Sequence, residues 1–212
     1  MQPLHDLLLL LVVLTDFWVL GTSRMSATIR ATGIQGALLA VLPVALYPGL
    51  SLHILGLAAG TFLIKAVVLP ALLSRAIREA AVRREVEPLV GFVPSMLFGA
   101  VAVTLAFTLA PRLPLPALEA PMLVPVSLAT VVIGLVVLTT RTKALTQVVG
   151  YLIMENGVFV FGLSQLERVP FLVEVGVLLD IFVGVFIMGI VVFHINREFD
   201  SIDSARLTEL HD

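Results

Sequence analysis

The sequence contains seven long apolar runs, and these constrain the fold more than any other feature. They cover residues 4–21, 27–46, 50–73, 89–110, 122–140, 144–164 and 171–192. A helix rises ~1.5 Å per residue, so ~20 residues cross the ~30 Å hydrocarbon core of a bilayer. Strands of a membrane barrel would be shorter and would alternate in polarity. The runs therefore predict an all-α integral membrane protein with about seven transmembrane helices.

The composition excludes several classes of protein. Of the 212 residues, 59% are hydrophobic and 13% are charged, too few polar residues to cover a soluble domain of this size. The net charge of −2 gives no sign of nucleic-acid binding. The absence of cysteine excludes disulfides, thiol catalysis and cysteine-ligated iron–sulfur clusters in this chain. The four histidines are far apart, so we expect no metal site, no cofactor and no catalytic residue here.

Basic residues predict the orientation of the chain. Arginine and lysine concentrate near the ends of the first, third and fifth runs and in the C-terminal tail, and only Arg112 and Arg168 lie on the other side. Short loops rich in these residues stay in the cytoplasm. We therefore expect an outside N-terminus and a cytoplasmic C-terminus. Residues 1–195 are predicted to form the membrane domain and 196–212 a cytoplasmic tail, either a solvated end or a docking segment.

The predicted spans contain a series of charged residues that we single out: Asp16, Lys65, Glu155, Glu174 and Asp180. A charge at mid-bilayer costs at least ~2.5 kcal/mol, so such residues are rare and usually functional. Glu155 and Asp180 are predicted near mid-membrane on adjacent helices, whereas Glu174 lies ~11 Å toward the outside. The series is typical of a proton relay. The alternative is a static ion pair of Lys65 with Asp180 or Glu155, and the role of Asp16 stays open.

Other residues in these runs are predicted to shape the helices. Pro70 removes the hydrogen bond to the carbonyl oxygen of Ala66, next to Lys65, and should kink the third span. We assign packing roles to Gly150, Asn156, Gly157 and Pro70.

Three segments carry a resemblance to a known family: FLIKAVVLPALL at 62–73, GYLIMENG at 150–157 and VEVGVLLD at 173–180. Together they resemble the E subunit of hydrogenase-4 and formate-hydrogenlyase-type complexes. They place Lys65, Glu155, Glu174 and Asp180 at positions that match the pattern of that family. Residues 121–195 also resemble the K subunit of respiratory complex I. Asp180 then matches the second membrane glutamate of the K subunit. The first membrane glutamate of that subunit would align with Leu152, about one helical turn from Glu155.

The resemblance implies a non-catalytic membrane subunit of a complex-I-related membrane-bound hydrogenase in the inner (cytoplasmic) membrane. Its partners would be antiporter-like membrane subunits, a peripheral hydrogenase arm and the lipid bilayer. The [NiFe] centre and iron–sulfur clusters would lie in partner subunits. Two alternatives remain: a component of a multisubunit cation/proton antiporter, or a structural scaffold whose buried charges are static.

Overall fold

A computed structural model of the protein describes residues 2–47, 51–79, 89–113, 120–166, 176 and 179–189. This part of the chain is helical and contains no strand. The elements are α1 (Gln2–Gly21), α2 (Met25–Leu46), α3 (Leu52–Thr61), the π-helix η1 (Phe62–Val68), α4 (Leu69–Glu79), α5 (Phe92–Leu109), the 3₁₀ turn η2 (Ala110–Arg112), α6 (Leu123–Thr140) and α7 (Ala144–Ser164). A further short apolar helix covers Leu179–Gly189.

The helices confirm the predicted fold class. In the described residues, six helices are long and apolar enough to cross a membrane, and the short helix Leu179–Gly189 falls within the seventh predicted span. The third span differs from its predicted end at residue 73, because α3, η1 and α4 continue as one helical rod to Glu79. Its last turns carry Arg75 and Arg78, which can extend a helix beyond the hydrocarbon core into the polar interface. The predicted tail, 196–212, lies outside the described residues.

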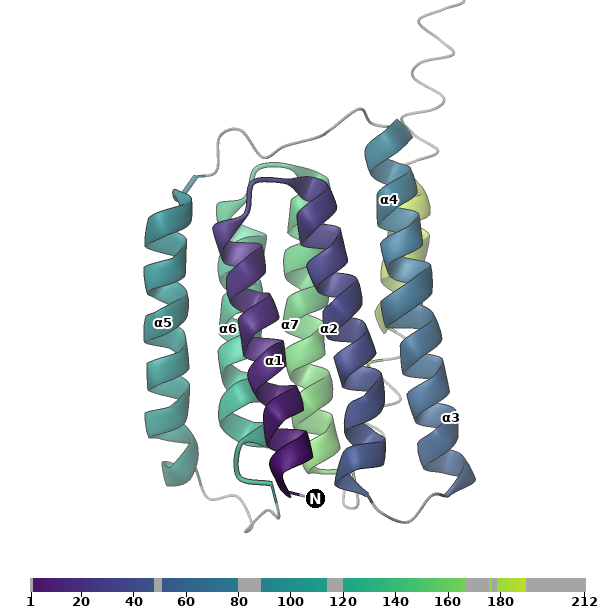
Figure 1. Ribbon diagram of the computed structural model, residues 1–212. Helices are drawn as coiled ribbons and strands as arrows, with labels where there is room; N and C mark the ends of the chain where they lie inside the picture. The colour runs from purple at the N-terminus through teal and green to yellow at the C-terminus, as the bar shows by residue number, and fades with distance from the viewer. Residues whose placement is uncertain are drawn as a thin grey trace, which may run out of the picture.

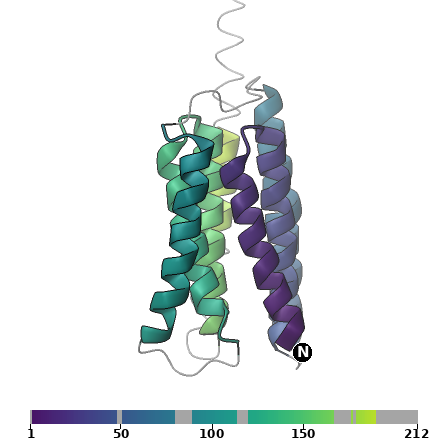
Figure 2. The same cartoon turned by 60° about the vertical axis from the view of Figure 1, so that its left-hand side comes forward.

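The helices stand side by side along one common direction (Figures 1 and 2). Helices α1, α2, α6 and α7 form the centre of the bundle, with α5 at one edge and the rod of α3, η1 and α4 at the other. Helix α5 packs on α6 and α1, whereas the rod packs on α2. The two edge elements expose most of their apolar side chains, as expected for surfaces that face lipid or other membrane proteins.

Helices α6 and α7 make the most extensive contact in the described chain. Glycines bring their backbones together: a Cβ atom on Gly157 would lie 2.7 Å from the backbone nitrogen of Val131, and Gly134 and Gly150 face the opposite backbone in the same way. Small residues allow this close approach of membrane helices. The contact therefore holds α7 at a defined height and rotation in the bundle.

Two apolar clusters fill the interior at different heights. One includes Leu73, Ile133 and Ile153, and the other includes Leu39 and Phe159. Several buried polar side chains lie at intermediate positions along the helices, at or near the boundary between the two clusters: Asp16, Gln35, Lys65, Thr130, Glu155, Asn156 and Asp180. The core thus has a polar layer between two apolar halves.

Candidate functional site: a buried charge cluster

Lys65 lies in the π-helix η1, at the centre of the rod. The backbone N–H of Leu69 donates to the carbonyl oxygen of Ile64, five residues earlier, which is the wider spacing of a π-helix. Pro70 follows directly and cannot donate to Ala66. The sequence predicted the freed carbonyl at Ala66 but did not predict the π-helix. Single π-helical turns are frequent at functional sites.

Helix α2 supports this segment through two glycines. A Cβ atom on Gly36 would lie 2.6 Å from the carbonyl carbon of Lys65, and one on Gly33 would lie 3.2 Å from Cγ of Pro70. The α2 backbone therefore touches the backbone of Lys65 directly. This contact sets the position from which the long lysine side chain extends.

The side chains of Lys65, Glu155 and Asp180 meet in the interior of the bundle. The Lys65 ammonium donates to the Glu155 carboxylate, and its Nζ lies 2.9 Å and 3.0 Å from the two carboxylate oxygens of Asp180. The ring centroid of Phe159 lies 5.6 Å from the same Nζ, within range of a cation–π interaction. The three ionisable side chains are only 1–3% exposed. The structure thus brings together three of the four residues predicted for a proton path, and Glu174 lies outside the described residues.

The charge balance of this cluster is its most informative property. It contains two acids and one base, and a buried net charge is costly. The cluster is neutral when Lys65 is an ammonium ion, one acid is ionised and the other acid carries a proton. One proton therefore has two alternative positions, Glu155 and Asp180, and Lys65 contacts both.

The second carboxylate oxygen of Glu155, Oε1, points toward the last helix. It is buried and has no hydrogen-bond partner among the described residues. A Cβ atom on Gly176 would lie 2.9 Å from it, so the absence of a side chain there leaves room for the carboxyl group. An unpaired carboxyl oxygen can carry a proton without breaking an existing hydrogen bond.

A second group of buried polar side chains surrounds Asp16, near the cluster of Lys65, Glu155 and Asp180. Both carboxylate oxygens of Asp16 accept hydrogen bonds, one from Nε2 of Gln35 at 2.7 Å and one from Oγ1 of Thr130 at 2.8 Å. The side-chain nitrogen of Asn156 donates to Oε1 of Gln35 at 2.9 Å. The sequence left the role of Asp16 open, and it did not identify Gln35 and Thr130 as members of a polar site. The available signal for these two residues was a polar side chain within an apolar run.

The residues predicted for packing are found in three places. Gly150 and Gly157 lie in the α6–α7 contact, and Pro70 lies at the start of α4 against Gly33. Asn156 also hydrogen-bonds across the bundle to α2. Within the part of the chain that the structure describes, no three metal-ligating side chains lie close enough together to hold an ion.

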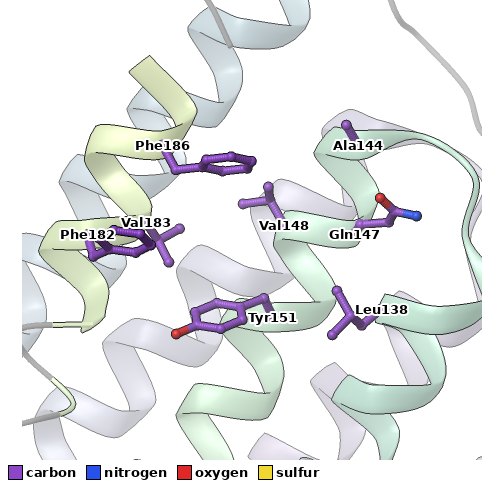
Figure 3. Close-up of a pocket in the computed structure, with 8 residues that line it drawn as sticks. All are labelled: Leu138, Ala144, Gln147, Val148, Tyr151, Phe182, Val183 and Phe186. Atoms are coloured by element: carbon purple, nitrogen blue, oxygen red, sulfur yellow. The ribbon is translucent and has the colours of Figure 1, made fainter. Parts of the chain in front are cut away.

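An apolar pocket of about 340 Å³ lies between the end of α6, the first half of α7 and the helix Leu179–Gly189 (Figure 3). The side chains that line it are Leu138, Ala144, Gln147, Val148, Tyr151, Phe182, Val183 and Phe186. Tyr151 lies one helical turn before Glu155, so the pocket is near the charge cluster but does not contain it.

The fold and the site define a multi-pass membrane protein with a cluster of ionisable side chains in its interior. The chain is 33% identical to the uncharacterized protein Rv0085 of Mycobacterium tuberculosis over 208 residues, covering 95% of this chain and 93% of that protein. It is 30% identical to hydrogenase-4 component E of Escherichia coli K12 over 155 residues, covering 72% of this chain and 71% of that protein. The same values hold for hydrogenase-4 component E of Shigella flexneri.

The chain therefore belongs to the hydrogenase-4 component E family. No family model matches it. No solved structure matches it either.

Proposed function

We propose that this chain is a membrane subunit of a complex-I-related membrane-bound hydrogenase and that it forms part of a proton path. Membership in the hydrogenase-4 component E family supports the first part. The observation that carries the second part is the buried contact of one lysine with two carboxyl groups. Such a cluster holds one transferable proton at its neutral charge state.

Lys65 would carry this proton between the two acids. The Lys65 ammonium donates one proton to the Asp180 carboxylate and takes one from the neutral Glu155 acid. Lysine is again an ammonium ion after the exchange, Asp180 is neutral and Glu155 is ionised. No net charge is created inside the membrane, which keeps the free-energy cost of the exchange low. Glu174, as a fourth member, would extend the path toward the outside.

The redox chemistry would take place in partner subunits. The [NiFe] centre and iron–sulfur clusters would belong to a peripheral arm on the cytoplasmic side, and antiporter-like subunits would continue the proton path in the plane of the inner membrane. The exposed apolar faces of α3 and α5 supply surface for lipid or for such subunits. The α1–α2 connection, the end of α4 and the α6–α7 connection lie at one end of the bundle, and the end of α5 lies at the other (Figure 1). In the described chain, the first end carries Arg24, Arg78 and Arg141, whereas Arg112 follows α5. This distribution supports a cytoplasmic location for the first end.

The resemblance of residues 121–195 to the K subunit of complex I, an expectation from the sequence motifs, would imply the same role. Glu155 would act about one turn away from the position of that subunit's first membrane glutamate, and Asp180 at the position of its second. A component of a cation/proton antiporter would use the same cluster without any hydrogenase. Identification of the co-purifying subunits, together with nickel and iron analysis of the complex, separates the two functions.

The decisive experiment replaces each acid by its amide. Glu155→Gln and Asp180→Asn keep the shape of the side chains but remove the titratable proton. We expect both variants to assemble and to keep redox activity with soluble electron carriers, whereas proton translocation in sealed vesicles falls at least tenfold. The double variant should be little worse than either single variant, because both changes interrupt one serial path.

Asp6→Asn is a matched control, since Asp6 is a carboxylate of α1 with a 41% exposed side chain. It should translocate protons like the wild type. Wild-type translocation by both Glu155→Gln and Asp180→Asn would refute the proton path and would favour the static scaffold.

A further inference from the structure

Asp16 is a buried carboxyl group that the proton path described above does not use. Its side chain is 0% exposed, and its hydrogen-bond donors, Gln35 and Thr130, are both uncharged. No lysine, arginine or histidine of the described chain forms an ion pair with it. A buried carboxylate without a counter-charge is costly. Asp16 is therefore a group for which taking up a proton relieves a large desolvation cost.

The surroundings of Asp16 contain few other charges. The helices packed on α1 are α2, α5 and α6. Along these helices the one charged residue is Arg30 of α2, which is exposed and donates to the carbonyl oxygen of Ser26. Just beyond the end of α6, the buried guanidinium of Arg141 donates to the carbonyl oxygen of Leu20, one turn after Asp16 on α1. The hydrogen-bonded chain from Asp16 through Gln35 ends at Asn156, which follows Glu155 in the sequence. The charged groups around Asp16 are therefore Arg141 and, beyond the two amides, the charge cluster.

Two side-chain amides connect Asp16 to that cluster. Asn156 donates to Oε1 of Gln35, and Nε2 of Gln35 donates to Oδ1 of Asp16, so both amide dipoles point toward the carboxylate. Asn156 is the residue after Glu155, and its side chain lines a small cavity together with Lys65 and Asp180. The cavity is too small for a water molecule. The two amides therefore form a hydrogen-bonded link from Asp16 to Asn156, whose side chain borders the same cavity as Lys65 and Asp180.

We propose that Asp16 is a second proton-binding site of this subunit, electrostatically coupled to the Lys65–Glu155–Asp180 cluster through Gln35 and Asn156. When Asp16 takes a proton on Oδ2, the Thr130 hydroxyl becomes the acceptor. Its hydrogen then turns to a carbonyl oxygen of its own helix, a common bond for threonine in helices. No proton crosses the amides; they transmit the change of charge by reorienting their dipoles. The inference deepens the proposed function and rests on it for its role in turnover.

Infrared difference spectroscopy of the full-length chain in lipid nanodiscs tests this proposal without any turnover. Lowering the pH should produce a protonated-carboxyl C=O band that is absent in Asp16→Asn. In Thr130→Val the band should remain and shift to higher frequency, because the carboxyl group loses one of its two hydrogen bonds. Thr130→Val keeps Asp16 itself, so it supplies the assignment if Asp16→Asn does not fold. Ser127→Ala is the control, because this buried hydroxyl of α6 bonds within its own helix, to Val124.

The coupling is measured as a double-mutant cycle. Glu155→Gln should move the titration midpoint of the Asp16 band, and this effect should disappear when Gln35→Leu removes the amide connection. A midpoint that Glu155→Gln leaves unchanged would overturn the coupling. The absence of a titrating band that responds to either Asp16→Asn or Thr130→Val would overturn the site itself. The vesicle experiment tests the proposed proton path, and its failure would count against that function alone. The infrared titration of Asp16 does not depend on proton translocation.

Discussion

Replacing Lys65 by methionine tests the charge cluster quantitatively. The variant keeps an unbranched side chain that is one heavy atom shorter, but it removes the ammonium group that donates to both Glu155 and Asp180. A hydrogen bond to a charged group contributes ~1.5–3 kcal/mol, so losing two of them predicts a cost of ~3–6 kcal/mol. Removing one member of a buried ion pair usually costs ~3–5 kcal/mol, in the same range. We expect Lys65→Met to lower the free energy of unfolding by ~3–5 kcal/mol.

The loss of stability in Lys65→Met depends on the two buried acids, Glu155 and Asp180, that no longer have a positively charged partner. Both carboxyl groups remain buried in Lys65→Met, and both must be protonated or remain unpaired. Adding Asp180→Asn removes one of them, so the double variant should be more stable than the single variant by ~1–3 kcal/mol. Proton translocation should be lost in both variants, while the partner subunits remain bound.

The assay is reversible unfolding of the full-length chain in mixed micelles, followed by circular dichroism. Arg78→Met is the control, because Arg78 lies on α4 of the same helical rod and is exposed; it should change stability by less than ~0.5 kcal/mol. The reasoning is wrong if Lys65→Met is as stable as the control. It is also wrong if Asp180→Asn destabilises the Lys65→Met protein further, since the cost would then not come from an unpaired acid.

Two further predictions concern packing and orientation. Gly36→Ala should destabilise the protein by ~1–3 kcal/mol, because its Cβ would collide with the backbone of Lys65. Gly60→Ala on α3 is the comparison, because a Cβ atom on Gly60 would have no neighbouring atom within 4 Å. It should be neutral or stabilising by up to ~1 kcal/mol in the same unfolding assay. A reporter active only in the cytoplasm should work when fused after Asp212 and fail when fused before Met1; the reverse result would contradict the orientation.

The sequence by itself determined the class of fold. The length and continuity of the apolar runs are local properties, and a bilayer accepts such runs almost only as helices. The sequence also identified Lys65, Glu155 and Asp180, because a charge within an apolar run is visible without any tertiary information. The short connection between the sixth and seventh runs predicted that Glu155 and Asp180 are neighbours, and the structure places both at the same lysine.

Tertiary structure alone decided how these residues are connected. The sequence left open whether Lys65 pairs with Glu155 or Asp180, since helix rotation depends on packing; the contact of Gly36 with the Lys65 backbone and the π-helix before Pro70 place the ammonium group against both. The environment of Asp16 was likewise hidden, because its partners Gln35 and Thr130 are 19 and 114 residues away. Polar side chains so far apart meet only through helix packing, which local sequence patterns do not encode.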